Sequence, residues 1–326
     1  MADPVAVDQW QGAAVRVSDV AGALSELRHR SGDGTSARTA VMTLIAVAGD
    51  DERADAASSA LRTLGSNHPA RLLILRPEPD AVAALDARAT LFSVEAAGHE
   101  VNFEEISLQV CGQAAKHLDS LVDAFVLSDL PVAVWYVGAI PDIGDPLLDV
   151  ATAVLVDSRD AADSGRLRGL LDLARRRTVV DLSWMRLRPW RSLFAMLFSE
   201  PLTRQWLSGV ESVAVEGKAG PRHMLGGWMM AQLGMQPRQV RMQEARHVRI
   251  DLDCRIGDEK ASFQIARPGG GRVIEARAVL PSYPCVPHHV HLGEDALAGS
   301  LSRALTHLEP DPVWERALSA ATHLDG

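Results

Sequence analysis

The sequence predicts two domains of different class, an α/β domain with a mixed, mostly parallel sheet and an α+β domain with an antiparallel sheet. In residues 37–200, short continuous apolar runs alternate with amphipathic helical patterns, as in a sheet covered by helices. After residue 200, single apolar residues alternate with polar ones, which is typical of antiparallel strands. The 326 residues are enough for two ordinary domains. We therefore expect domains at 37–200 and 201–326, preceded by a helical segment and linker at 1–36.

The first domain begins with a βα unit. Residues 41–48 form an apolar run that predicts a buried strand, and Asp50 follows it as the N-cap of a helix. A second apolar run at 72–75 predicts the next strand, so the connection has the length of a right-handed βαβ crossover. Residues 88–110 predict two extended segments around Gly98, with a shift of apolar phase that favours a β-bulge near Glu105.

The remaining elements follow the same two patterns. Helices are predicted at 112–127, at 160–177 and after Leu187, and strands at 130–138 and 154–156. The strand at 130–138 is apolar on both faces, which places it at the centre of a sheet. In the second domain, strands are predicted around 248–254, 261–265 and 272–280, and two amphipathic helices close the chain.

Charge and composition exclude several classes of protein. The 33 basic and 42 acidic residues give a net charge of −9, which disfavours nucleic acid as a partner because phosphate binding needs clustered Lys and Arg. Residues 1–10 lack a secretory pattern, and the most apolar stretch, 132–140, is about half as long as a membrane-spanning helix. The three cysteines are far apart and odd in number, which argues against a disulfide framework. We expect a soluble cytoplasmic protein with no membrane partner.

Candidate catalytic and metal sites are weak. Cys285, His289 and His291 combine ligand types that suit zinc, but no further ligand can be assigned to them. The chain contains no GxSxG, P-loop or HExxH motif, so we assign no catalytic residue and no cofactor.

One alternative is an α/β enzyme that binds a sugar phosphate beyond the carboxyl ends of the parallel strands. The residues at those positions are Asp50, Gly138, Asp157 and Ser158. A helix N-cap explains Asp50 more simply, and a turn explains Asp157 and Ser158.

The segment 181–191 is the strongest candidate for an interaction surface. It interleaves aromatic and guanidinium groups, the side chains that dominate protein interfaces because they bury large areas and keep directional polar contacts. Trp190 continues an apolar helical stripe and is expected in the core. The interface candidates are Trp184, Arg186, Arg188 and Arg191.

A series of short stretches carries a family resemblance. In order, they are HPAR at 68–71, HLDS at 117–120, SDLPVAVWYVG at 128–138, LVDS at 155–158 and the 181–191 segment. Their order and spacing resemble the OpcA family of glucose-6-phosphate dehydrogenase assembly proteins. The resemblance implies a non-catalytic partner that binds glucose-6-phosphate dehydrogenase and promotes its active oligomer in the oxidative pentose phosphate pathway. It brings no catalytic residue, and an allosteric activator of this kind acts through protein–protein interaction.

Overall fold

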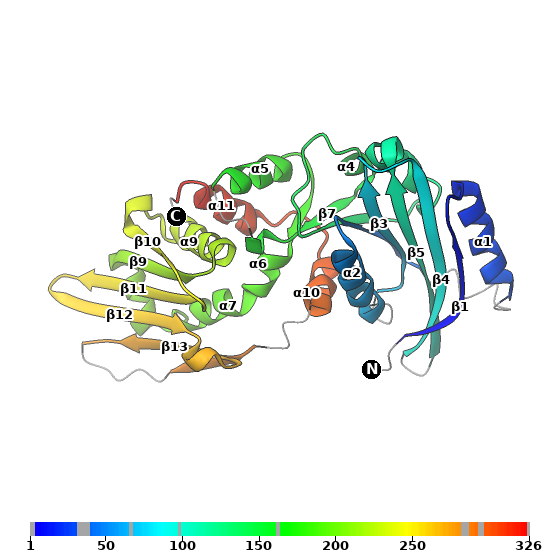
Figure 1. The fold of residues 1–326 in the computed structure, drawn as a ribbon. Helices are drawn as coiled ribbons and strands as arrows, with labels where there is room; N and C mark the ends of the chain where they lie inside the picture. The colour runs from blue at the N-terminus through cyan, green and yellow to red at the C-terminus, as the bar shows by residue number, and fades with distance from the viewer. Residues whose placement is uncertain are drawn as a thin grey trace. The chain divides into compact units, whose positions relative to one another are not determined.

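The computed structural model describes residues 4–30, 40–64, 68–96, 99–160, 164–281, 287–292 and 297–324. The chain divides into two compact units, each built around one sheet (Figure 1). The first unit comprises Met1–Asp157, Arg176–Val180 and Leu297–Glu309, and the second comprises Ser158–Arg175, Asp181–Ala296 and Pro310–Gly326. Both units therefore contain segments that are distant in sequence.

The sheet of the first unit has the strand order β1-β4-β5-β3-β2-β6-β7-β8. Its strands are β1 (Val5–Gly12), β2 (Met42–Ala48), β3 (Ala70–Glu78), β4 (Ala84–Ala96), β5 (His99–Cys111), β6 (Val132–Val137), β7 (Ala153–Val156) and β8 (Val179–Asp181). Neighbours from β5 through β7 pair in parallel, whereas β4 pairs antiparallel with β1 and β5. The prediction of a mixed, mostly parallel sheet is confirmed.

Two helices bind opposite faces of this sheet through consecutive glutamates of β5. Glu104 binds Arg28 of α1 (Val17–Arg30), with 2.8 Å from Nη2 to Oε2, and also binds Arg71 of β3. Glu105 accepts from Arg62 of α2 (Asp51–Leu64), with 2.6 Å from Nη2 to Oε1. Because successive strand residues point to opposite faces, these ion pairs attach α1 and α2 on different sides.

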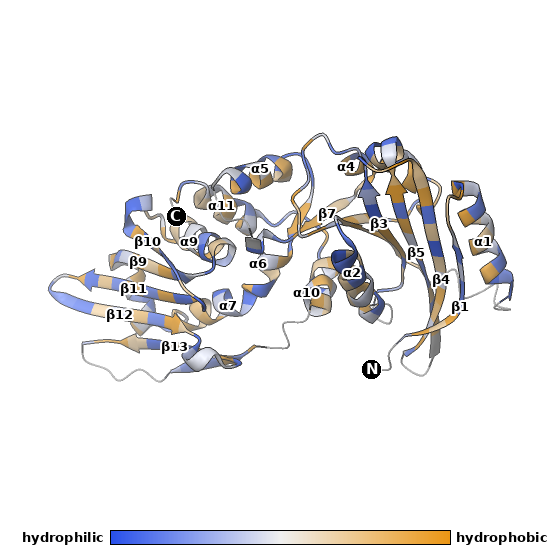
Figure 2. Cartoon of the chain, in the orientation of Figure 1, coloured by the Kyte–Doolittle hydropathy of each residue, from blue (hydrophilic) through white to orange (hydrophobic). Residues whose placement is uncertain are grey.

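The predicted bulge near Glu105 is wrong. The pairing of β5 with both β4 and β3 runs without a register shift. The apolar phase changes in the sequence because Glu104 and Glu105 are both buried and both paired with arginine, so charged residues occupy interior positions. Alternating hydrophobic and hydrophilic bands along β4 and β5 are visible in Figure 2.

The helix predicted at 112–127 is instead two short pieces, a 3₁₀ turn (Gly112–Lys116) and α3 (Leu118–Val122). His117 between them has φ −130° and ψ 47°, outside the helical region. Gly112 has φ +74°, and a Cβ there would lie 2.9 Å from the backbone of Ala83, so this turn requires glycine. The first unit also contains α4 (Leu147–Val150) and α10 (Leu297–Thr306), which packs against α2.

The N-terminal segment contains a strand that the sequence pattern did not indicate. β1 is largely exposed and forms the edge of the sheet, so it carries no buried stripe of apolar residues. The helix expected in this segment is α1. Residues 31–36, the expected linker, lie outside the described residues.

The second unit contains a six-stranded sheet in the order β10-β9-β11-β12-β13-β14. Its strands are β9 (Val210–Gly217), β10 (Val240–Glu244), β11 (Arg249–Ile256), β12 (Glu259–Ala266), β13 (Val273–Val279) and β14 (His288–His291). Neighbouring strands pair antiparallel, except that β9 and β10 run parallel. The predicted class of the second sheet is confirmed.

Two helices, α7 (Arg188–Leu197) and α9 (Ala219–Leu233), pack against the strands of this sheet. The second unit also contains α5 (Ser164–Ala174), α6 (Leu182–Arg186), α8 (Pro201–Arg204) and α11 (Pro312–Ala321). The central helix is α9, which contacts β9, β10 and α11. A Cβ on Gly227 of α9 would lie 2.2 Å from the carbonyl oxygen of Ala317, so glycine permits the close approach of α9 and α11.

The two compact units do not follow the boundary at residue 200 that the sequence suggested. Helices α5 to α7 lie with the second sheet, although they precede that boundary, and α10 lies with the first sheet, although it follows it. The helices of the described part of the chain also lack the combination of length and apolar character needed to cross a membrane.

Candidate functional site

The 181–191 segment begins with a buried aspartate that caps a helix. The Asp181 carboxylate accepts a hydrogen bond from the backbone N–H of Ser183, with 2.9 Å from N to Oδ1, and so satisfies an unpaired donor at the start of α6. It also accepts from both the backbone N–H and the hydroxyl of Ser158, at 3.0 and 2.6 Å. Asp181 and Ser158 are both buried. The carboxylate therefore joins two segments of the second unit.

Asp311 repeats this arrangement at the start of α11. It accepts from the backbone N–H groups of Val313 and Trp314, at 2.9 and 3.1 Å. The indole N–H of Trp184 also donates to Asp311, with 2.8 Å from Nε1 to Oδ2. In return, the indole N–H of Trp314 donates to Asp181 across 3.3 Å. Each aspartate caps its own helix and binds the tryptophan of the other helix.

This reciprocal pair was not predicted, although it has a signal in the sequence. Both helices begin with an aspartate followed three residues later by a tryptophan, at 181–184 and at 311–314. Three residues is the spacing between an N-cap and the third helical position, so both residues lie in the first helical turn. The pairing between the two motifs depends on the tertiary structure.

Trp184 is only 1% exposed, which leaves its side chain no surface to offer a partner in this structure. The guanidinium of Arg191 lies over its ring, 3.5 Å from the centroid, and Arg191 Nη2 donates to the backbone oxygen of Trp184. Burial lowers the pKa of Arg191, and the negative charge of Asp311 opposes that shift. These contacts place Trp184 and Arg191 within the packing between α6 and α7.

The other residues of the segment differ in exposure. Trp190 is buried, in line with its predicted place in the core. Arg186 is half-buried, and Arg188 is exposed at the start of α7. Arg188 is therefore the candidate that presents the most surface, with Arg186 and Arg191 partly accessible. Contact of these arginines with a partner stays a prediction.

Three residues of the alternative enzyme site contact other groups of the protein. Asp50 accepts from the backbone N–H of Arg53 at 2.8 Å and forms an ion pair with its guanidinium at 3.5 Å, as expected for an N-cap. The backbone of Gly138, which follows β6 with φ +69°, lies against the same Arg53 side chain. Ser158 donates its hydroxyl to Asp181.

Asp157 directly follows β7. The structure thus uses Asp50 and Ser158 to hold local structure.

The metal hypothesis involves a residue outside the described part of the chain, Cys285. His289 and His291 lie on the same face of β14, as predicted, and both are exposed. His289 Nε2 is 3.3 Å from Glu275 Oε2 of β13. The described residues contain no group of three or more His, Cys, Asp or Glu side chains placed to hold a metal ion. Metal binding at these positions stays a prediction.

The open face of the second sheet carries most of its charged side chains. Along β11, Ile250, Leu252 and Cys254 are buried, and the residues between them point to the other face. On that face, Arg249 forms a bidentate pair with Asp251, and Arg255 pairs with Glu211. This surface is polar and accessible, in contrast to the helix-covered face of the sheet.

Comparison with known proteins identifies two family models in succession. Residues 61–175 match a model for the N-terminal domain of a glucose-6-phosphate dehydrogenase subunit, and residues 177–318 match a model for the corresponding C-terminal domain. No curated protein matches the sequence. Among solved structures, glucose-6-phosphate 1-dehydrogenase from Mycobacterium avium is similar, with 8% identity, 88% of this chain and 91% of that chain covered, and a TM-score of 0.48.

The two family models have the same order as the two domains and together cover most of the chain. They agree with the resemblance that the motifs between residues 68 and 191 carry. The chain therefore belongs to the OpcA family of glucose-6-phosphate dehydrogenase assembly proteins.

Proposed function

We propose that this protein is a non-catalytic partner that binds glucose-6-phosphate dehydrogenase and promotes its active oligomer. The observation that carries the proposal is the pair of family matches, whose descriptions both name a subunit of that dehydrogenase. A subunit or assembly protein acts by contact with another folded chain. The activity of the dehydrogenase then increases, and with it the flux through the oxidative pentose phosphate pathway.

The local chemistry supports this role. The serine and aspartate that the enzyme alternative relies on are engaged in capping and in holding segments together, at Ser158 and Asp50. A general base or nucleophile needs its polar atoms directed at a substrate, within hydrogen-bond reach of the reacting group. In this structure the polar atoms of Asp50 and Ser158 are directed at groups of the protein itself.

The energy required of such a partner is modest. A protein that binds the active oligomer more tightly than the inactive form shifts the population toward the active form. A tenfold shift requires only about 1.4 kcal/mol of differential binding free energy. We propose that Arg188, with the flanking Arg186 and Arg191, contributes to this contact through the accessible side of α7.

The test combines size analysis with enzyme kinetics. The purified chain is mixed with its cognate dehydrogenase, and molar mass by light scattering, Vmax and KM are measured with and without the chain. We expect a complex of defined stoichiometry and a change in Vmax or KM. A dehydrogenase that keeps its size and its kinetics at concentrations well above those of both proteins in the cell would refute the proposal.

A matched pair of variants tests the surface. Arg188→Ala removes an exposed arginine of α7, and Arg16→Ala removes an exposed arginine of the first unit whose ion pair, with Asp19, is local. We expect the first variant to weaken the complex and the second to leave it unchanged. If binding occurs and both variants bind equally well, the dehydrogenase contacts another surface, and the proposed assembly role stands without this interface.

A further inference from the structure

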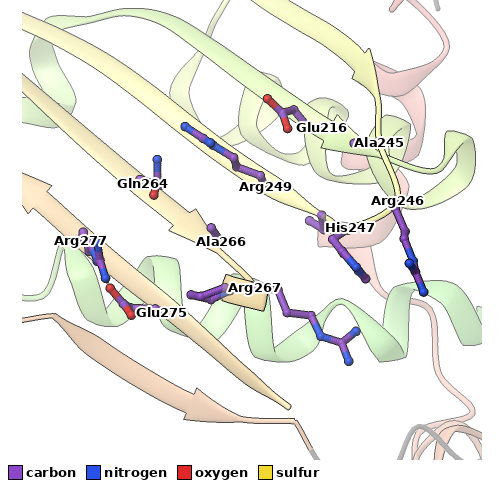
Figure 3. Close-up of a pocket in the computed structure, with 12 residues that line it drawn as sticks. Glu216, Ala245, Arg246, His247, Arg249, Gln264, Ala266, Arg267, Glu275 and Arg277 are labelled. Carbon is purple, nitrogen blue, oxygen red and sulfur yellow. The ribbon is translucent and has the colours of Figure 1, made fainter. Parts of the chain in front are cut away.

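A hollow on the second unit opens at one end of the polar sheet face. Its volume is about 460 Å³, within the range of small-molecule sites. It is lined by the loop before β11, by the strands β11, β12 and β13, and by the turn after β12 (Figure 3). Four arginines, one histidine and two glutamates face it. The hollow therefore has an excess of positive groups in a chain whose net charge is −9.

Two of the four arginines are already neutralised. Arg249 is held by Asp251, with hydrogen bonds of 2.7 and 2.9 Å to its carboxylate oxygens. Arg277 forms an ion pair with Glu275. Arg246 and Arg267 differ, because no carboxylate among the described residues forms an ion pair with either of them. The uncompensated charge is thus concentrated at the end formed by these two residues.

The geometry at that end is built by the glycine-rich turn. Figure 3 shows Arg246, His247 and Arg267 at the same end of the hollow. Arg267 Nε donates to the backbone oxygen of Gly271, which orients the guanidinium. Gly270 has φ +68°, and a Cβ there would lie 2.8 Å from His247 Nε2, so the turn packs directly on the imidazole. A side chain at residue 270 would be strained and would displace His247.

We propose that this hollow binds the phosphate of a small phosphomonoester that also carries hydroxyl groups. Arginine recognises phosphate because its planar N–H donors match two phosphate oxygens at once. Arg246 and Arg267 supply this recognition, and His247 adds a ring N–H between them. The ligand is a free metabolite, because a hollow bounded by a turn and by strands suits a molecule of limited size.

The strand residues next to these arginines define the rest of the ligand. Glu216 of β9 is paired in register with Arg249, Arg249 with Ala266, and Ala266 with Glu275 of β13, so the two carboxylates lie in one row across the floor of the hollow. Carboxylates accept hydrogen bonds from hydroxyl groups and repel a second anion. The hollow therefore selects a molecule with one phosphate and a neutral polyol body, over a bisphosphate of similar size.

The experiment uses the full chain without the dehydrogenase, so its outcome is independent of the proposed assembly role. Binding of inorganic phosphate, glucose 6-phosphate, glucose and fructose 1,6-bisphosphate is measured by calorimetry at low salt, because salt screens charged contacts. We expect glucose 6-phosphate to bind most tightly, inorganic phosphate more weakly, and glucose not at all. The bisphosphate is expected to bind more weakly than glucose 6-phosphate.

Three variants locate the site. Arg246→Ala combined with Arg267→Ala removes the phosphate contacts and is expected to weaken glucose 6-phosphate binding by about tenfold or more, since each arginine makes charged hydrogen bonds. Ala266→Phe keeps all charges but fills the hollow from β12, and should weaken binding as strongly. Arg255→Ala removes an arginine of the same sheet face outside the hollow, and should change affinity less than about twofold, as is typical of a remote surface residue.

Several results would overturn the proposal. One is that the wild-type chain does not bind glucose 6-phosphate at about 10 mM. That concentration lies above the dissociation constants, on the order of 1 mM, of weakly bound ligands. Equal binding of glucose and glucose 6-phosphate would remove the role of the phosphate. Unchanged affinity in the double arginine variant or in Ala266→Phe would place the ligand elsewhere. If the double variant fails to fold, Ala266→Phe and the comparison of ligands still decide the question.

Discussion

The central strands of the first sheet are buried on both faces, whereas the strands of the second sheet are buried on one. In β2, β6 and β7 nearly every residue is buried, and β5 holds two glutamates inside, one on each face. In β11 and β12, buried and accessible residues alternate. Arginine–carboxylate pairs therefore have different roles in the two sheets. In the first sheet they attach helices to buried strand residues, and on the second sheet they lie on an exposed, charged surface.

Truncation of a buried side chain between the helices of the second unit should destabilise the protein as much as truncation within the first sheet. Trp184→Ala removes a side chain that is 1% exposed, together with its hydrogen bond to Asp311 and its stacking with Arg191. We expect the free energy of unfolding to fall by about 3–5 kcal/mol, the usual cost of truncating a buried aromatic residue. Urea denaturation measures this loss. A variant as stable as the wild type would show that Trp184 is not part of the packed core.

The buried ion pairs of the first sheet provide the next largest effect. Glu105→Ala leaves Ser58 and Arg62 without their acceptor, at a side chain that is 2% exposed. Removing one partner of a buried pair costs about 3–5 kcal/mol, and we expect about 3 kcal/mol because Arg62 is partly accessible to water. Chemical denaturation tests this value. A loss below about 1 kcal/mol, the range of surface pairs, would contradict the distinction between the two sheets.

A buried thiol on the second sheet should make the free energy of unfolding depend on pH. Burial raises the pKa of the Cys254 thiol from 9.0 to about 12, with the charges of Asp253 and Glu211 acting in the same direction. Between these two values the unfolded thiol ionises and the folded thiol stays protonated, so stability falls as pH rises from about 9 to 12.

Denaturation curves at several alkaline pH values measure this decline, and Cys254→Ala should reduce its slope. An unchanged slope would show that the thiol is not protected by the sheet.

The smallest effect is expected on the open face of the second sheet. Arg255 and Glu211 form a pair in which both side chains are more than 40% exposed. Arg255→Ala should change the free energy of unfolding by no more than about 0.5 kcal/mol, because water and salt screen exposed charges. Thermal and chemical denaturation provide the measurement. A loss comparable to that of Glu105→Ala would mean that this face is less accessible than the structure shows.

Patterns that depend on neighbouring residues were predicted well. The strand at 130–138 and the strands around 248–254 and 261–265 appear as β6, β11 and β12. The sequence also indicated that Asp50 caps a helix and that Trp190 is buried, and both predictions are confirmed. These features follow from the periodicity of apolar residues and from capping chemistry, which act over a few residues.

Patterns that depend on distant partners were not predicted. The bulge near Glu105 was wrong because a buried glutamate was interpreted as a break in the apolar pattern, whereas Arg62 from α2 neutralises it. β1 was missed because an edge strand needs no apolar stripe. The 181–191 segment was considered an interaction surface, yet Trp184 is buried by contacts with a helix more than 100 residues away in the chain.

The amino-acid sequence by itself determined the class of each domain, the absence of familiar catalytic motifs and the family resemblance, because these depend on residue type and local spacing. Only the tertiary structure decided which helices join which sheet, how the two Asp-x-x-Trp motifs pair, and that Arg246 and Arg267 line the same hollow. The physical reason is that burial and charge compensation depend on residues brought together by the fold. A charged side chain has the same identity in both sheets, but its energy depends on which groups surround it.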